Sequence, residues 1–253
     1  MAVYLIIIFG EIDQVAIGFL LWGLLGVGQA FIGICIHDKL HRSYLDNQLI
    51  NGLLEIPIIA IGVESAIWKI EHNYLHHNYT NIEGIDGDID PRFLFRFSKY
   101  QPRKWFHQFQ HLYAPFFYSL FLVEWITSKD FVKTIKYHKM GLIKSKQEAR
   151  NLIVIIILKK ILFYALFLII PIAVLPFSTA IIIGMFFTMI AVAGIILTVI
   201  FQIGHVVPTT DFIHQDTHTT KENWHIHQLK TTSNFGSNSR LVTYLMGGLN
   251  YQI

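Results

Sequence analysis

The distribution of hydrophobic positions along the 253-residue chain predicts several long apolar helices. Residues 15–36 form a run of 22 residues without a formal charge, which as a helix would measure about 33 Å and cross the hydrocarbon core of a bilayer. Two further apolar runs follow at 161–177 and 180–203, and only Ser178 and Thr179 separate them. We therefore predict an all-α integral membrane protein, with a tight hairpin between the second and third spans.

Shorter apolar segments complete this picture. Residues 1–9 are too short to span and are interpreted as the stub of an earlier helix. Residues 47–70 contain acids and a proline and are expected to lie at the membrane surface or to insert only partly. Residues 93–125 mix aromatic and basic side chains, which suits either an interfacial amphipathic helix or a helix packed on the rest of a cytosolic domain. Lys159 and Lys160 are expected to mark the interface where the second span begins.

Composition and charge narrow the class of protein. Hydrophobic residues make up 53% and charged residues 15%, which excludes a disordered chain and argues against an ordinary soluble enzyme. Seventeen of the 20 Lys and Arg lie between Lys39 and Lys160. We expect this region to face the cytoplasm, because basic residues gather on that side of a membrane protein. This interpretation is favoured over a nucleic-acid-binding surface. A single cysteine, Cys35, excludes an internal disulfide framework and a cysteine-based metal site.

Histidine is the residue type that suggests chemistry. Residues four apart share one face of a helix, and such pairs occur in HDKLH and HNYLHH. The second residue of the HH doublet would point about 100° further round and serve a neighbouring metal ion. Five or six imidazoles at one depth can hold two metal ions. The histidines at the ends of apolar segments are His37, His41, His72, His76, His77 and His205.

The choice of metal is open from these residues alone, because imidazole suits iron, copper, zinc and nickel. A membrane-embedded alkyl substrate favours iron with O₂, since no side chain supplies the required oxidant. Ligating histidines usually donate their other N–H to a carboxylate, for which Asp38 and Asp88 are the predicted partners, among candidates that include Glu71 and the acids of 83–90. A bis-histidine haem is disfavoured, because these histidines come in pairs at span ends.

The remaining histidines fit surface positions. They lie among interfacial aromatic residues and lysines or in a polar stretch. At such positions a surface histidine is the better interpretation than a metal ligand. They are His107, His111, His138, His214, His218 and His225.

Taken together, HDKLH, HNYLHHNYTN, FQIGHVV, WHIHQLKTTSNF and GGLNYQI resemble the membrane fatty acid desaturase family, closest to its bacterial acyl-CoA or linoleoyl-CoA, front-end type. The resemblance covers nearly the whole chain. It implies a single domain over 1–253, with a transmembrane helical bundle and a cytosolic helical cap that carries a di-iron site. It also implies a multi-pass protein with its active site on the cytoplasmic side of the bacterial inner membrane.

The resemblance implies a ligand set and a reaction. Histidine boxes of the forms HxxxH and HxxxHH or HxxHH map onto the first two groups, and a further ligand maps onto His205 or onto His227 in WxxHQ. Two irons and O₂ would place a cis double bond in an acyl chain linked to CoA or lipid. Ferredoxin or cytochrome b5, with its reductase, would donate electrons.

In the family, GGLNYQI leads into a third box of the form QxxHH, in which Gln252 would be the first residue. We therefore expect that the sequence stops before this box, and that most of the first family helix is also missing. Two alternatives follow: a related lipid hydroxylase or ketolase with the same ligands, or a catalytically inactive membrane fragment.

Overall fold

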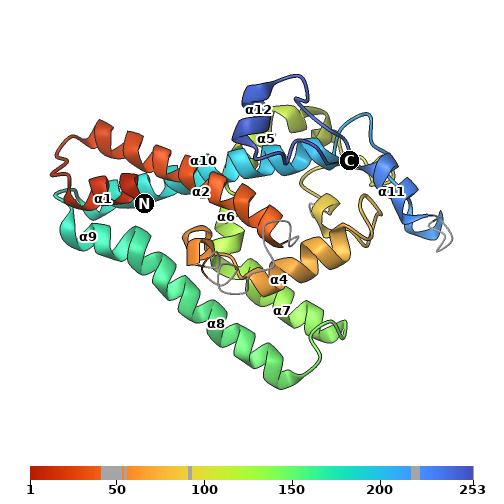
Figure 1. The fold of residues 1–253 in the computed structure, drawn as a ribbon, viewed down its shortest axis with the longest axis horizontal. Helices are drawn as coiled ribbons and strands as arrows, with labels where there is room; N and C mark the ends of the chain where they lie inside the picture. Colours follow the sequence, from red (N-terminus) through yellow and green to blue (C-terminus); the bar gives the residue numbers. More distant parts are fainter. Residues whose placement is uncertain (41–52, 54–55, 91–92, 218–222, 253) are drawn as a thin grey trace. The chain divides into compact units, whose positions relative to one another are not determined.

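The computed structural model describes residues 1–40, 53, 56–90, 93–217 and 223–252, and its described backbone is helical or irregular apart from one parallel β-bridge between Ile82 and Ile213 (Figure 1). The chain divides into two compact units. The first comprises Met1–Ile67 and Phe116–Leu197, and the second comprises Trp68–Pro115 and Thr198–Ile253.

The first unit is built around two long apolar helices, α2 (Val15–Leu40) and α10 (Thr179–His205), the latter continuing into the second unit. Three glycines of α2 face α10: a Cβ added at Gly18, Gly26 or Gly33 would collide with Met185, Met189 or Leu197, respectively. Small residues at these positions let the two backbones approach closely, as they do in membrane helix pairs. The spacing of the glycines therefore determines how α2 and α10 pack.

Shorter elements pack around this pair. Helix α1 (Ala2–Phe9) contacts α2 and is joined to η6 (Ala165–Ile169) by the Tyr4 hydroxyl, which donates to the Leu166 carbonyl at 2.9 Å. The 3-10 helix η1 (Ile56–Ile61) also lies against α2, because Gln29 donates to the Ala60 carbonyl at 2.6 Å. The apolar segment expected as a helical stub thus forms a helix of this unit.

Three helical segments are long and apolar enough to cross a membrane: Val15–His37, Lys146–Val174 and Thr179–His205. The first and third agree with the predicted runs. The second comprises α8 (Lys146–Tyr164), η6 and α9 (Ile170–Val174). It begins 15 residues before the predicted start at 161, because α8 runs without interruption through Lys159 and Lys160.

Partners in the same unit explain why these two lysines lie within a helix. The Lys160 ammonium donates to the carbonyls of Trp125 at 2.6 Å and Gly62 at 3.2 Å, and to the Asp130 carboxylate at 3.0 Å. The Lys159 ammonium lies 2.7 Å from a Glu64 carboxylate oxygen. Charges buried in an apolar interior require such partners, so the pairs tie α8 to the segments around Gly62 and Asp130.

Three consecutive helical segments precede α8: α6 (Phe121–Glu124), the π-helix η5 (Trp125–Lys129) and α7 (Asp130–Lys139). Helix α7 packs against α8. The short helix α4 (Ser65–Lys69) leads into the second unit. The core of the first unit includes large side chains from several of these elements, among them Trp22, Leu122, Tyr137, Phe163 and Met189.

The second unit contains short helices joined by irregular segments. They are η2 (Ile70–His76), η3 (Gly87–Ile89), η4 (Trp105–Phe109), most of α5 (Gln110–Ser119), η7 (Gln215–Thr217), α11 (Trp224–Thr231) and α12 (Arg240–Leu245). Within 93–125 helical structure begins at Trp105, and an exposed apolar stripe follows it along Phe109, Leu112 and Phe116.

His107 differs from its predicted surface position. Its side chain is buried, its Nε2 lies 2.9 Å from the Phe93 carbonyl, and its Nδ1 accepts from the Lys104 backbone N–H at 3.1 Å. The imidazole is buried because both ring nitrogens have backbone partners. Exposed His111 agrees with the prediction.

The glycine contacts lead to a stability prediction. Gly26→Ala should lower the melting temperature of the detergent-purified protein, because a methyl group against the Met189 backbone overpacks the interface at a cost of about 1–3 kcal/mol. Gly23→Ala and Gly28→Ala are matched controls in the same helix, since a Cβ at either position meets nothing within 4 Å. Equal melting temperatures for all three variants would contradict the proposed close packing.

Candidate metal centre

A π-helix places the histidines of HNYLHH. Segment η2 (Ile70–His76) continues α4, and the His77 N–H donates to the His72 carbonyl at 3.0 Å, five residues back. This widened turn brings the rings of His72 and His77 together, and their Nε2 atoms lie 3.1 Å apart. His77 therefore faces His72, because a π-helical turn stands where the prediction assumed an α-helical one.

The ring of His72 is fixed from both sides. It stacks on the Trp68 ring with centroids 4.3 Å apart and on the His76 ring with centroids 5.3 Å apart. Two nitrogens that each bind the same metal ion at about 2.1 Å would lie no more than about 4.2 Å apart. The 3.1 Å separation of the His72 and His77 nitrogens fits such a shared ion.

A buried carboxylate orients His76. Its Nδ1 lies 3.1 Å from each oxygen of Asp86 and 3.4 Å from an oxygen of Asp88. Asp86 is held in turn by the backbone N–H groups of Asn81 and Asp88, at 2.8 and 2.9 Å. With Nδ1 donating to Asp86, Nε2 of His76 is the nitrogen that would bind a metal ion once it has given up its proton.

The charges of this pair reinforce each other. Burial favours a neutral imidazole, but the negative charges of Asp86 and Asp88 outweigh it and raise the pKa of His76 to about 9. The same pairing lowers the pKa of the Asp86 carboxyl against the effect of its burial. The carboxylate therefore stays ionised and available to hold the imidazole.

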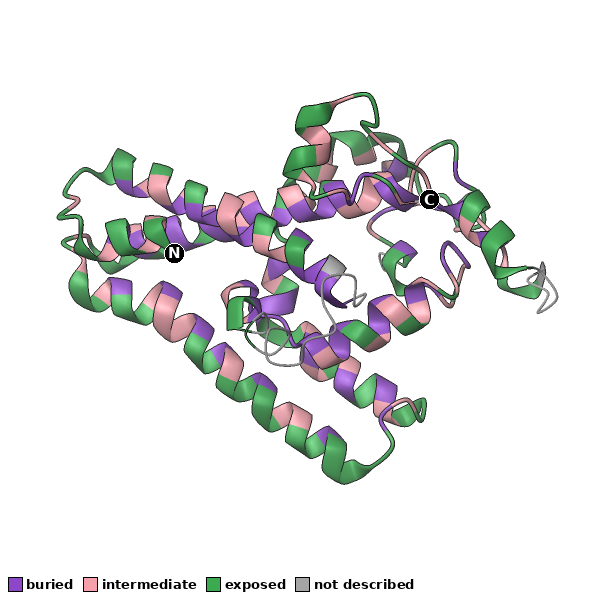
Figure 2. Cartoon of the chain, viewed as in Figure 1, coloured by how far each residue is buried: buried purple, intermediate pink, exposed green. Residues whose placement is uncertain are grey.

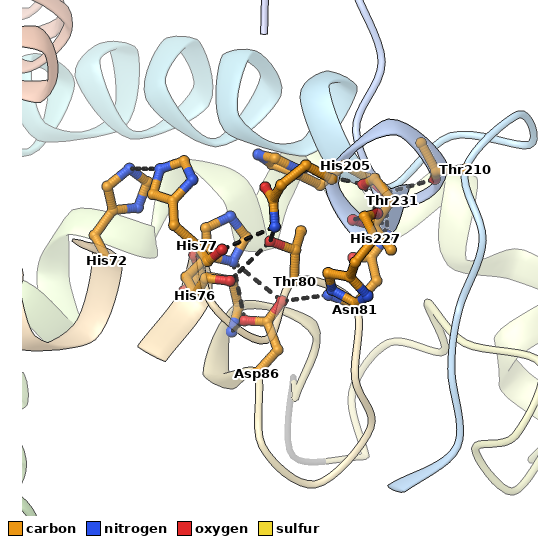
Figure 3. A network of polar contacts seen from close by, with 12 residues as sticks. His72, His76, His77, Thr80, Asn81, Asp86, His205, Thr210, His227 and Thr231 are labelled. Atoms are coloured by element: carbon orange, nitrogen blue, oxygen red, sulfur yellow. Dashed lines mark hydrogen bonds and ion pairs between the residues drawn. The ribbon is translucent and has the colours of Figure 1, made fainter. Parts of the chain in front are cut away.

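His205 joins this group from the end of α10. Its ring lies edge-on to that of His76, with centroids 4.5 Å apart, and 6.5 Å from that of His77 (Figure 3). Its carbonyl accepts from the Thr210 hydroxyl at 2.6 Å. Four imidazoles from two distant parts of the sequence thus lie together in the second unit.

Asn81 connects the segments that carry these rings. Its side-chain amide donates to the carbonyls of His205, Asp211 and Thr231, at 2.8, 3.1 and 3.3 Å. The residue is fully buried and has φ of 57°, a left-handed conformation that asparagine tolerates better than most residues. One side chain therefore joins the loop after η2 to the end of α10 and to α11.

His227 is buried on α11, which contacts the same group through its neighbours. Trp224 and Gln228 both donate to the His77 carbonyl, at 3.1 and 2.8 Å, and the His227 carbonyl accepts from the Thr231 hydroxyl. These bonds attach α11 to the histidine group.

The other predicted site residues are distributed over the first unit, the second unit and the part of the chain that is not described. His37 is buried at the end of α2 in the first unit, whereas His41 and the side chain of Asp38 lie outside the described residues. Asp88 lies near His76, as predicted, and single ligand atoms of His72, His76 and Asp88 fall within 4.8 Å of one another.

Sequence reasoning did not select two residues of this site. Asp86, rather than Asp88, makes the buried contact with His76, although it stood in the acidic run 83–90. Asn81 gave no signal beyond its place in HNYLHHNYTN. Both act through the turn that follows η2.

Apolar helices able to cross a membrane and a compact group of imidazoles define a histidine-rich membrane protein. The model of the family described as "Fatty acid desaturase" matches residues 15–253, and the chain belongs to this family. The sn-1 linoleoyl-lipid 6-desaturases of Arthrospira platensis and Synechocystis sp. are 34% and 32% identical to it, over 90% and 86% of this chain. Acyl-lipid (8-3)-desaturase B of Dictyostelium discoideum is 29% identical over 91%.

The chain spans 62% and 60% of the two linoleoyl-lipid 6-desaturases and 52% of the Dictyostelium protein. No solved structure matched the chain significantly.

The His76–Asp86 contact leads to a prediction about metal affinity. Asp86→Asn should weaken binding of a first-row divalent metal by about 10–100-fold, because the neutral amide holds the imidazole less firmly and lowers its basicity. Metal titration of the purified protein measures this. Asp90→Asn, an exposed acid of the same segment, is the matched control. Unchanged affinity in Asp86→Asn would contradict the orienting role.

A second prediction concerns the stability of this unit. Asn81→Gly keeps the left-handed backbone but removes the amide that donates to the carbonyls of His205, Asp211 and Thr231, at a cost of about 0.5–1.5 kcal/mol for each lost hydrogen bond. We expect a lower melting temperature and faster proteolysis of segments around Asn81. Asn78→Gly, at an exposed position nearby, is the control. Equal behaviour of the two variants would rule out the connecting role of Asn81.

Proposed function

We propose that this protein is an O₂-dependent fatty acyl desaturase that inserts a cis double bond into a lipid-linked acyl chain at a non-haem di-iron centre. The observation that carries the proposal is the group of four imidazoles, with His76 oriented by the buried Asp86. Family membership supports it. The names of the relatives, which include linoleoyl-lipid and acyl-lipid desaturases, favour a lipid-linked substrate over acyl-CoA.

The overall reaction balances as follows. Two hydrogens leave neighbouring methylene carbons of the acyl chain, and one molecule of O₂ becomes two molecules of water. The substrate supplies two electrons and two protons, and an external donor supplies the other two electrons, with protons from solvent. The donor would be ferredoxin or cytochrome b5 with its reductase. Bound iron supplies the oxidising power that no side chain has.

The residues of this chain position that chemistry. His72 and His77 offer facing nitrogens, and His76 offers Nε2 because its Nδ1 is occupied by Asp86. The end of α10 brings His205 against His76. We propose that further ligands come from His37, His41 and His227, and that the site lies on the cytoplasmic side beneath a helical cap.

The test is expression of the protein in a host whose lipids lack the product. We expect fatty acids two mass units lighter than their precursors, with a cis double bond located by mass spectrometry. His76→Ala should abolish the product, because it removes a ligand and leaves Asp86 without its partner. His111→Ala, an exposed histidine on α5, is the matched control and should retain activity.

The same experiment separates the alternatives. Fatty acids that gain one oxygen atom would identify a hydroxylase on the same ligands. Purified desaturase should contain about two irons per chain, as two histidine-lined sites require. A protein with no bound iron and no O₂ consumption would instead be an inactive relative, and a new double bond produced by His76→Ala would refute the role of the histidine group.

A further inference from the structure

The hairpin formed by α7 and the start of α8 carries an unusual excess of positive charge. Residues 131–158 contain one acid, Glu148, and six basic residues: Lys133, Lys136, Lys139, Lys144, Lys146 and Arg150. All six except the half-buried Lys133 are exposed. We propose that these six residues, which we call the basic tip, bind the headgroups of anionic phospholipids.

The single acid offsets only one of the six positive charges, and it also caps the start of α8. A Glu148 carboxylate oxygen accepts from the Lys144 backbone N–H at 3.0 Å, and the Glu148 N–H donates to the Ser145 hydroxyl at 3.0 Å. These are the bonds of a helix cap. The basic tip thus presents a net positive charge.

The backbone of the tip is held in one conformation. The turn reverses at Gly141, with φ of 77°, and the Leu142 N–H donates to the Tyr137 carbonyl at 2.9 Å. His138 lies with Nδ1 3.0 Å from the Ile143 carbonyl, and Tyr137 and Ile143 are buried beneath the turn. The lysines therefore extend from a fixed scaffold, so binding requires ordering of the side chains only.

The surroundings of the tip favour a lipid surface over an acidic protein. Val132, Ile135 and Met140 are each 51% exposed, and each is next to a lysine of α7 in the sequence. The green, exposed colouring of the turn between α7 and α8 continues along α8 (Figure 2). On α8 the exposed apolar surface continues through Val154 and Leu158. An acidic protein would complement the charges but leave this apolar border in water, whereas a bilayer interface accommodates both.

The length of the second apolar segment also suits this placement. Lys146–Val174 has 29 residues, which corresponds to about 43 Å of helix. The hydrocarbon core is about 30 Å thick and the bilayer with its headgroups about 40–45 Å. A segment of this length that crosses the membrane reaches through the headgroup layer, where its basic first turns meet phosphate groups.

The experiment measures lipid preference in the full chain. Wild-type protein is equilibrated in mixed micelles with equal amounts of phosphatidylglycerol and phosphatidylcholine, and the retained lipids are counted by native mass spectrometry. We expect phosphatidylglycerol to be retained preferentially. The triple variant Lys136→Gln, Lys139→Gln, Lys146→Gln should lose that preference by about tenfold or more. Added salt should weaken it as well.

Two controls make the result specific. The variant Lys99→Gln, Arg103→Gln, Arg240→Gln removes three exposed charges elsewhere and should keep the preference. Replacement of the same three tip lysines by arginine should also keep it, which separates charge from folding. Wild-type protein without a preference would overturn the proposal. An unchanged lipid preference in the glutamine variant would also overturn the proposal. If that variant kept its lipid preference but lost binding to an acidic ferredoxin, the basic tip would bind a protein instead of lipid.

Discussion

A charged group in an apolar interior loses its hydration, and the penalty is several kcal/mol unless a partner replaces the water. This constraint determines the placement of segments in both units. Lys160 satisfies it with Asp130 and two carbonyls, and so joins α8 to two other segments. In the second unit Asp86 satisfies it with His76 and two backbone N–H groups. The turn after η2 must therefore fold back onto the histidines.

The second unit shows how much the arrangement of the histidine group depends on residues outside it. Its imidazoles come from segments more than 100 residues apart in the sequence, and Asn81 bridges them with its amide. Trp224 and Gln228 attach α11 to the same place through one carbonyl. A network of amides and carbonyls thus joins the segments that carry the rings, while the Asp86 carboxylate holds the His76 ring itself.

Much of this architecture could be predicted from the sequence, because long uncharged runs leave few options and the histidine strings are compact. The span at 15–36 and the run at 180–203 fall within helices of the structure. The start of α8 could not be predicted, since the partners of Lys160 at Gly62 and Asp130 lie far away in the sequence. The choice of Asp86 over Asp88, and the buried position of His107, likewise depend on turns whose path no periodic pattern encodes.

The π-helix of η2 has a consequence for how histidine boxes vary in length. A π-helical turn closes between residues five apart, whereas an α-helical turn closes between residues four apart. In HNYLHH the first and last histidines are five apart and lie face to face. A box shortened by one residue, HxxHH, would bring the same two histidines together on an ordinary α-helix. The π-helical turn of η2 therefore compensates for one inserted residue. The two sequence forms of the box, HxxxHH and HxxHH, can then present their histidines in equivalent geometry.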